Sequence, residues 1–520
     1  MAEHPNGTSH QGGGSGGSVN GTPLSGMLRG ALAQQRQATP AHPTPPPSAP
    51  AAQPAVMPDA EGLAQMPGAL PVSRAVIRAL QEAVSQDLVT REEETSRPLS
   101  DEDRLELARS LVAKRVSAWA VEHARQHAPL GASQLEAVRQ AIINALFRAG
   151  PLQQYLDDEG VENVVVDGLR VEVEYFDRPT RRVDPVADDD EGLVALINRL
   201  AARSGHGDRI LNPASPMVNF RLPDRSRVAA TLQTTHPTMV IRRHRVMKAS
   251  LEDLVTWGTL SPALSAFLQG LVLGRQTILV AGDMGVGKTT LLRALVRQVP
   301  TGERVITLET DRELFLDEDP DIAAHVMAME ERASNGEIGR DGREIGRITI
   351  ADMYPHTLRM NSNRVVVGEV RSTEVVPMLD AMSSGGRGSM CTLHAAYPRL
   401  VLPRLVQLCQ GAGMNVDSVH QLVSNAINFV VFIRQIDQTP IGGRRHRFVS
   451  HVLQVSPGEG GRPAFSEVFA PDGKGDPRGV PKLPPSGECA QEMADAGFDR
   501  RWLTEPQFGR WPTPMEVIKR

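Results

Sequence analysis

The chain has 520 residues, of which 40% are hydrophobic and 22% charged, and its formal net charge is −5. This length allows about two or three domains with sizeable cores, and the slightly acidic balance argues against a protein that binds polyanions over its whole surface. No apolar stretch approaches the roughly 18 residues that a membrane span needs, so a soluble protein is expected. The chain begins without a basic segment and an apolar run, which favours a cytoplasmic location. Cys391, Cys409 and Cys489 are predicted to be free thiols.

The first part of the chain, residues 1–70, is rich in Gly, Ser, Ala, Pro and Gln. It carries too few apolar side chains to offset the entropy of ordering, and a disordered tail is therefore predicted. A docking arm for a partner is the alternative function for this tail.

Helical periodicity begins in the next segment, residues 71–150. Apolar stripes at 72–88, 105–119 and 135–146 predict three amphipathic helices. Ser100 and Asp103 have the spacing of a capping box at the start of the second helix. This part of the chain is expected to be a helical N-terminal segment.

Residues 151–250 change to short β-branched runs with one helical pattern, which predicts a small α/β N-terminal domain. The acidic run 188–191 is interpreted as the solvated start of the helix, and a metal site is the less favoured alternative. The expected strands are 161–166, 171–176, 218–222, 228–232 and 238–241, and the expected helix is 193–203.

Residues 251–470 alternate strands and helices, as a doubly wound parallel sheet does, and a RecA-like core is predicted. Its expected strands are 278–281, 305–308, 364–367, 389–393 and 429–433. A hairpin insertion is predicted at about 320–350, with 326–329 pairing with 348–350. Residues 471–520 return to Pro and Gly and are predicted to be a C-terminal extension with a short helix.

The sequence G-D-M-G-V-G-K-T at 282–289 directly follows the apolar run 277–281. A buried strand, a glycine-rich turn and a helix starting at Lys-Thr place backbone N–H groups and a positive dipole end around a phosphate, so this is interpreted as a nucleotide-binding P-loop. Lys288 is expected to reach the β- and γ-phosphates, and the Thr289 hydroxyl to complete the shell of Mg²⁺. ATP and Mg²⁺ are the expected cofactors. The predicted nucleotide-binding residues are Gly282, Asp283, Met284, Gly285, Val286, Gly287, Lys288, Thr289 and Thr290.

A second chemical element, R-V-V-V-G-E-V-R at 364–371, is an apolar strand that ends in a carboxylate. Strands parallel to the P-loop strand point their carboxyl ends at the same crevice, so Glu369 is predicted to be the Walker B residue that orients the attacking water or acts as its base. Arg371 is expected to contact phosphate or a neighbouring subunit, with a structural ion pair as the alternative.

Two further stretches are L-E-T-D-R-E-L at 308–314 and G-S-M-C-T-L-H-A at 388–395. Together with the Walker B element they resemble the acidic box, Walker B and histidine box of the type II/type IV secretion ATPase family. The resemblance is closest to the CpaF/TadA type that drives tight-adherence (Tad) pilus assembly. It extends upstream through S-P-M-V at 215–218, L-P-D-R-S-R-V at 222–228 and V-I-R-R at 240–243, and so covers about residues 135–435.

The resemblance implies roles for individual residues. Arg227 and Arg242 would be the N-terminal-domain arginines that reach the nucleotide, Glu309 and Glu313 the acidic-box carboxylates near Mg²⁺, and His394 the residue that senses phosphate. The chain departs from the family pattern at Thr310, where Asp is usual, and at 372–373, where small glycines are common. The first departure leaves open which acidic-box carboxylate faces the metal.

The function implied is an ATP-hydrolysing motor of a secretion or pilus-assembly machine. The resemblance also implies a homo-hexamer that works on an inner-membrane platform protein, and so lies at the inner face of the membrane through its partners. Direct nucleic-acid binding is not expected, given the net charge of −5. One alternative is a conjugal transfer or type IV secretion ATPase, which shares every motif. The other is a nucleotide-gated scaffold without productive turnover, suggested by the altered acidic box.

Overall fold

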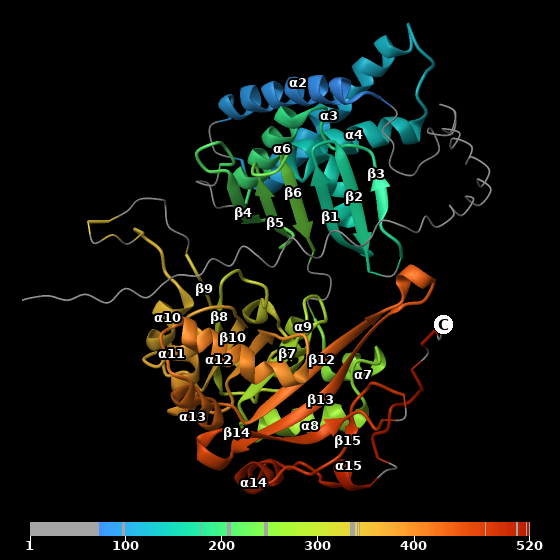
Figure 1. The fold of residues 1–520 in the computed structure, drawn as a ribbon. Coiled ribbons are helices and arrows are strands. Elements are labelled where there is room, and N and C mark those ends of the chain that lie inside the picture. Colours follow the sequence, from blue (N-terminus) through green and yellow to red (C-terminus); the bar gives the residue numbers. More distant parts are fainter. Residues whose placement is uncertain are drawn as a thin grey trace, which may run out of the picture. The chain divides into compact units, whose positions relative to one another are not determined.

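The computed structural model describes residues 72–518, except 96–98, 177, 205–209, 244–247, 333–338, 341, 343, 474, 506–507 and 516 (Figure 1). The tail predicted for residues 1–70 lies outside the described residues. In chain order, the described residues form a helical bundle, a six-stranded sheet and a nine-stranded sheet.

The helical bundle consists of the three predicted helices, α2 (Arg74–Glu93), α3 (Asp101–His123) and α4 (Ala132–Phe147). Their apolar stripes form one cluster, with Val84, Val112 and Val138 at its centre. Ser100 caps α3 by accepting a hydrogen bond from the N–H of Asp103 at 3.1 Å, as the spacing predicts. Polar contacts join the bundle to the six-stranded sheet. Arg203, which directly follows the helix that packs on this sheet, donates to carbonyl groups at the end of α4.

The six-stranded sheet is antiparallel, in the order β3-β2-β1-β6-β5-β4, and α6 (Asp190–Ala202) packs on it (Figure 1). Asp189 caps α6, which confirms the capping interpretation of the acidic run. The edge strand β3 was not predicted, because its three residues are mostly exposed and two of them are Arg. The strands are β1 (Val161–Asp167), β2 (Arg170–Tyr175), β3 (Arg181–Val183), β4 (Met217–Arg221), β5 (Arg227–Thr231) and β6 (Thr238–Arg242).

The nine-stranded sheet has the order β15-β14-β13-β12-β7-β11-β10-β8-β9. The six strands from β12 to β9 are parallel, and β13, β14 and β15 extend the sheet by antiparallel pairing. The strands are β7 (Ile278–Gly282), β8 (Arg304–Glu309), β9 (His325–Glu330), β10 (Arg364–Val370), β11 (Met390–His394), β12 (Phe429–Asp437), β13 (Arg445–Pro457), β14 (Pro463–Ala470) and β15 (Val480–Pro481).

Helices cover both faces of this sheet, which explains why its central strands read as continuous apolar runs. Ile278 and Val280 of β7 point into one core cluster, and Leu279 and Ala281 point into the other. The first cluster includes α7 (Leu251–Thr256), α8 (Pro262–Leu273), α9 (Lys288–Val296) and α14 (Gly487–Asp495). The second includes α10 (Ile350–Thr357), α11 (Val375–Ser383), α12 (Val401–Gly411) and α13 (Val416–Ala426).

Short helices connect these elements. They are α5 (Gln153–Asp157), α15 (Arg501–Thr504) and the 3₁₀ helices η1 (Gly150–Leu152), η2 (Leu316–Glu318), η3 (Pro398–Leu400), η4 (Thr439–Ile441) and η5 (Glu459–Gly461).

In the predicted hairpin insertion at 320–350, the pairing of 326–329 with 348–350 was wrong. Residues 326–329 belong to β9, which pairs in parallel with β8 and packs Met327 and Met329 against the core. Ile348 makes only an isolated bridge with Arg332, and Ile350 is the first residue of α10. The β-branched run was misread because a local capping box decides its fold: Thr349 caps α10 and accepts from the N–H of Asp352.

The last part of the chain belongs to the core. β15 pairs with β14, and Met493 of α14 is fully buried in the first core cluster. Gln276, next to the P-loop strand, donates to Glu492 at 2.8 Å. A segment predicted as an extension from its Pro and Gly content therefore completes one face of the nine-stranded sheet.

Candidate nucleotide-binding site

The P-loop lies between the buried strand β7 and helix α9, at the carboxyl end of the parallel strands. Gly285 and Gly287 have φ values of +71° and +100°, which L side chains rarely adopt. At Gly282 an added Cβ would collide with the carbonyl oxygen of Ile433 on β12. The glycine spacing seen in the sequence thus has a backbone reason at each position, and it suits a loop whose backbone approaches a phosphate closely.

Lys288, the first residue of α9, is buried and donates to the carbonyl oxygen of Asp283 at 2.7 Å. Its Nζ atom lies 3.1 Å from Nδ1 of His394, at the end of β11. Burial lowers the pKa of Lys288 to about 8, although the charges of Glu369 and Asp283 act in the opposite direction. An incoming phosphate would supply the counter-charge that this ammonium group lacks.

Glu369 lies near the end of β10, half-buried between two cationic or polar partners. His394 Nε2 is 2.9 Å and Arg371 is 2.5 Å from its carboxylate oxygens. Burial by itself would raise the pKa of Glu369, but hydrogen bonds from His394 and Arg371 outweigh it and lower the pKa to about 2. The structure therefore brings the predicted Walker B and histidine-box residues into direct contact with each other and, through His394, with Lys288.

Glu309, the last residue of β8, is 2% exposed. Its Oε1 atom accepts from the N–H groups of Glu313 and Leu314, both at 2.9 Å. Its Oε2 atom is buried and has no hydrogen-bond partner among the described residues. Burial raises the pKa of Glu309 to about 7, against the effect of the two backbone hydrogen bonds. A buried carboxylate oxygen without a partner fits a site that receives a hydrated cation.

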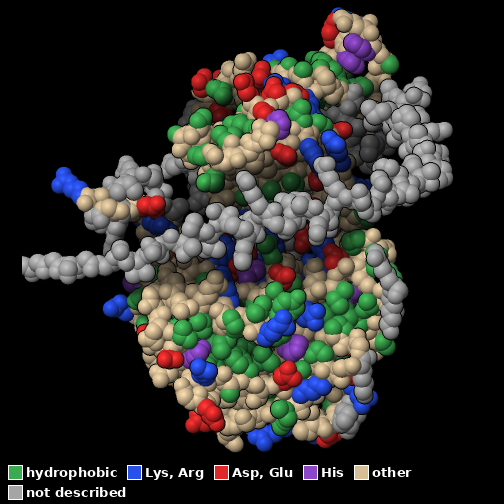
Figure 2. All heavy atoms as spheres, in the orientation of Figure 1, with side chains coloured by type: hydrophobic (Ala, Val, Ile, Leu, Met, Phe, Trp, Pro, Cys, Tyr) green, Lys and Arg blue, Asp and Glu red, His purple; other side chains and the backbone are tan. Residues whose placement is uncertain are grey.

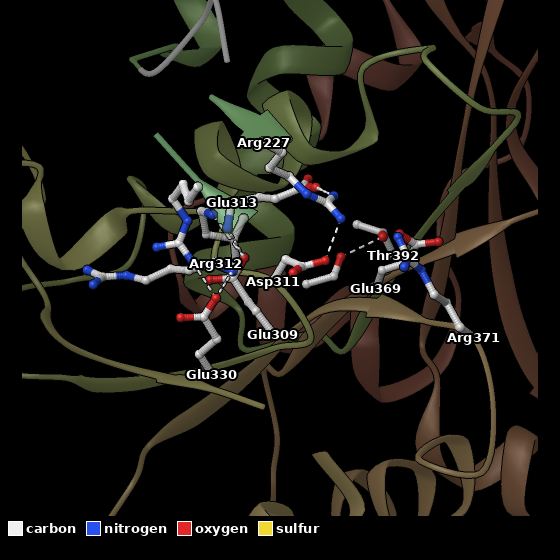
Figure 3. Close-up of polar contacts among 12 residues, drawn as sticks. Arg227, Glu309, Asp311, Arg312, Glu313, Glu330, Glu369, Arg371 and Thr392 are labelled. Carbon is white, nitrogen blue, oxygen red and sulfur yellow. Dashed lines mark hydrogen bonds and ion pairs between the residues drawn. The ribbon is translucent and has the colours of Figure 1, made fainter. Parts of the chain in front are cut away.

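Arg227, the first residue of β5, points at the acidic box and forms ion pairs with both Asp311 and Glu313 (Figure 3). Arg242 pairs with Arg227 in the β5–β6 register, and its charge lowers the pKa of Lys288. In the described part of the chain, however, the Arg242 side chain has no ion pair or hydrogen bond. Of the two arginines predicted to cross from the N-terminal domain, Arg227 therefore forms ion pairs with the core, and Arg242 forms none within the described residues.

Arg227, Glu309, Glu369 and Thr289 face one cavity of ≈ 30 Å³, which is room for about one water. In the residues that the structure describes, no group of three or more His, Cys, Asp and Glu side chains is arranged to hold a metal ion. Thr289 and Glu309, the predicted Mg²⁺ ligands, both line this cavity, and their metal role stays a prediction. The remaining lining residues are Thr310, Asp311, Glu313, Gly368 and Arg371.

The sequence reasoning missed one buried charge of the site, Arg293 on the P-loop helix α9. It is 4% exposed and donates to the carbonyl oxygens of Leu314, at 3.1 Å, and of Glu313. Arg293 thus binds the carbonyl oxygens of the same turn whose N–H groups donate to Glu309. The available signal was an Arg inside the otherwise apolar run 291–296, since a charged residue among buried positions needs partners.

Comparison with known proteins identifies the family. The model of the family described as type II/IV secretion system protein matches residues 186–447. The chain belongs to this family. A candidate conjugal transfer protein of Mycobacterium tuberculosis is 30% identical over 316 residues, which are 58% of this chain and 85% of that protein. The protein VirB11 of Agrobacterium fabrum is 26% identical over 322 residues, covering 55% of this chain and 88% of VirB11.

Solved structures of secretion ATPases are also similar to the chain. The VirB11 ATPase of the Brucella suis type IV secretion system, in complex with sulphate, is 24% identical, with a TM-score of 0.30, over 61% of this chain and 96% of VirB11. The pilus retraction motor PilT with bound ADP is 15% identical, with a TM-score of 0.37, over 58% of this chain and 82% of PilT. The predicted membership of the secretion ATPase family is confirmed, and closeness to the Tad type stays a prediction.

Two further observations concern the described helices and the surface charges. None of the described helices combines the length and the apolar character that crossing a membrane requires. On the face drawn in Figure 2, Lys and Arg side chains lie among Asp and Glu side chains. The expectation that the chain does not bind nucleic acid directly stays a prediction.

Proposed function

We propose that this family member hydrolyses Mg-ATP and that hydrolysis drives a secretion or pilus-assembly machine. The observation that carries the proposal is the contact between Lys288, His394 and Glu369 at the carboxyl end of the parallel strands. In this proposal Lys288 is the phosphate-binding cation, His394 the phosphate sensor and Glu369 the group that orients water, which a P-loop ATPase requires. The partnerless Oε2 of Glu309 supports an acidic box that works with Mg²⁺.

Each residue has a separate task in this proposal. Lys288 and the P-loop N–H groups bind the β- and γ-phosphates, and Thr289 with Glu309 completes the Mg²⁺ shell. Bound Mg²⁺ neutralises charge on the phosphate oxygens. Glu369 accepts the hydrogen bond that orients the attacking water, and it stays ionised because its pKa of about 2 lies far below neutrality. Arg227 supplies a second positive charge from the N-terminal domain.

The residues around this centre would report its state. His394 touches both Lys288 and Glu369, so a change at the phosphate reaches the Walker B strand through one imidazole ring. Arg371 holds the other side of Glu369, and Glu313 holds Arg227. When nucleotide enters, Arg227 exchanges its carboxylate partners for phosphate.

We infer the working assembly from the family. The proposed assembly is a homo-hexamer in the cytoplasm that acts on an inner-membrane platform protein. Pilin subunits of a Tad-type pilus are the proposed cargo. A conjugal transfer ATPase is the second candidate, favoured by the relative of that description at 30% identity. The two candidates differ in their membrane partner, so co-purification of a pilus or of a conjugation platform protein decides between them.

The activity is tested by separating binding from turnover. Lys288→Ala is expected to abolish turnover mainly by weakening nucleotide binding, whereas Glu369→Gln retains binding and stalls hydrolysis. Binding of a fluorescent ATP analogue and release of phosphate are measured on both variants. If Glu369→Gln hydrolyses ATP as fast as the wild type, the Walker B assignment is mistaken. If the unmodified chain binds ATP but does not hydrolyse it, the nucleotide-gated scaffold is favoured.

A further inference from the structure

Phe315 follows the acidic box directly and has an unusual environment. Its ring is 5% exposed and is surrounded by three guanidinium groups. Arg225, Arg312 and Arg221 lie 5.0 Å, 5.4 Å and 5.5 Å from the ring centroid. Distances below about 6 Å are those of cation–π attraction, which is stronger when the cation is partly removed from water.

Two of the three arginines come from the N-terminal α/β domain, and their positions are fixed by ion pairs with the core. Arg221, the last residue of β4, pairs with Glu330 of β9, and Arg225, in the β4–β5 turn, pairs with Glu318 of η2. Figure 3 shows Glu330 close to Arg312, whose backbone N–H donates to Glu330 at 2.8 Å. The tip of the β4–β5 hairpin is thus held both by charge and by the face of one aromatic ring.

The backbone at this contact is strained on both sides. Phe315 has φ +46° and Arg225 has φ +73°, which are left-handed values at residues other than glycine. Such conformations are costly for residues other than glycine and persist where the surroundings enforce them, often at sites that switch. The two strained residues contact each other. We therefore infer that Phe315 does more here than fill an apolar gap.

Phe315 directly follows a turn that is hydrogen-bonded to the nucleotide site. The N–H groups of Glu313 and Leu314 bond to Glu309, and their carbonyl oxygens bond to Arg293 of the P-loop helix. A shift of Glu309 or of α9 therefore moves the Phe315 ring. On the other side, Arg221 and Arg227 are direct partners in the β4–β5 register, so whatever holds Arg221 also positions Arg227.

We propose that Phe315 is a positioning residue that couples the acidic box to the N-terminal domain, by holding Arg221 and Arg225 so that Arg227 of the same hairpin meets the nucleotide. The proposal rests on the ATPase function proposed above. It differs from a purely structural role in that the face of the ring, and not only its volume, matters. It therefore predicts that aromatic and aliphatic side chains of similar size behave differently.

The test compares Phe315→Leu, Phe315→Tyr and the control Phe508→Leu in the full-length chain. Phe508 is a matched control because Arg501 lies 5.4 Å from its ring, among C-terminal residues away from the acidic box. Phe315→Leu is expected to lower kcat about tenfold with KM changed less than about twofold, whereas Phe315→Tyr stays within about threefold of wild type. Phe508→Leu is expected to leave both constants unchanged.

A second readout does not need turnover. A non-hydrolysable ATP analogue should slow hydrogen exchange in residues 217–231 of the wild type and of Phe315→Tyr, but not of Phe315→Leu, while protection at 282–290 persists in all. If Phe315→Leu misfolds, Arg225→Gln on the surface of the same contact should reproduce its effects. Equal behaviour of the Leu and Tyr variants, or unchanged hairpin protection in Phe315→Leu, overturns the proposal. A wild type that shows this protection without hydrolysis would overturn the ATPase function and leave the coupling intact.

Discussion

His394 joins the two Walker elements through its two ring nitrogens. Nδ1 lies 3.1 Å from Nζ of Lys288, and Nε2 lies 2.9 Å from the carboxylate of Glu369. One neutral tautomer suits both contacts, with Nε2–H donating to Glu369 and Nδ1 accepting from Lys288. A phosphate that binds Lys288 competes with His394 for the same ammonium group, and this gives the histidine box a direct means of sensing it.

The first prediction concerns the pH dependence of ATP binding. Without nucleotide, Lys288 has a pKa of about 8, lowered by burial, so it is charged below this pH and neutral above it. A bound phosphate favours the charged form of Lys288. Nucleotide binding above pH 8 must therefore be coupled to the uptake of a proton by Lys288. Affinity is expected to be flat below about pH 8 and to fall at higher pH, by at most about tenfold per pH unit. Calorimetric titration between pH 7 and 9.5 measures it, and Lys288→Ala should lack the slope. An equal slope in that variant would assign the proton to another group.

The second prediction distinguishes Arg227 from Arg242. Each change to Ala should lower turnover by about 10³-fold or more, if both arginines reach the phosphates. An ATP analogue should then no longer protect residues 215–243 from hydrogen exchange, while 282–290 stay protected. Only Arg227→Ala should also loosen this region without nucleotide, because only Arg227 pairs with Asp311 and Glu313. Unchanged protection in both regions would leave the arginines as surface charges.

The third prediction concerns Arg293 and the turn behind the acidic box. Arg293→Gln removes the donors to the carbonyl oxygens of Glu313 and Leu314 and should destabilise the protein by about 3 kcal/mol, the cost of breaking buried polar contacts to a charged group. Urea denaturation measures the change in the free energy of unfolding. Arg297→Gln, at the residue that follows α9, is the comparison variant, because the Arg297 side chain is less buried than that of Arg293. A loss below about 1 kcal/mol would mean that the turn keeps its shape without Arg293.

The fourth prediction concerns the tail. Deletion of residues 1–70 is expected to leave ATPase activity and subunit stoichiometry intact, because the composition of this segment predicts a tail that contributes no core. Mass measurement in solution and a turnover assay check both properties. Loss of the oligomer or of turnover would place a folded element within these residues.

The elements with strong local signals were predictable from the sequence. The P-loop, the parallel strands around it and the helices α2, α3 and α4 each follow from periodicity, glycine spacing or capping residues. The failures have local causes too. Residues 348–350 have β-branched side chains, but the capping bond between Thr349 and Asp352 starts a helix there. The Pro and Gly content of 471–520 hid the fact that Met493 is a core residue.

The site was predictable as a set of residues, but its internal contacts were not. Motif positions indicated that Lys288, Glu369 and His394 belong together. Which acidic-box carboxylate has a free oxygen depends on the turn that follows β8, where two N–H groups occupy only one oxygen of Glu309. Arg293 and Phe315 lie outside the motifs, and their roles arise from contacts between residues distant in the sequence.

The ion pairs of Arg227 have a consequence for the way this site engages a phosphate. Arg227 is paired with Asp311 and Glu313, so it can neutralise phosphate charge only after these pairs part. Phosphate binding by Arg227 and release of the acidic box are therefore two sides of one exchange. Until that exchange the acidic box keeps a counter-ion that belongs to the chain itself.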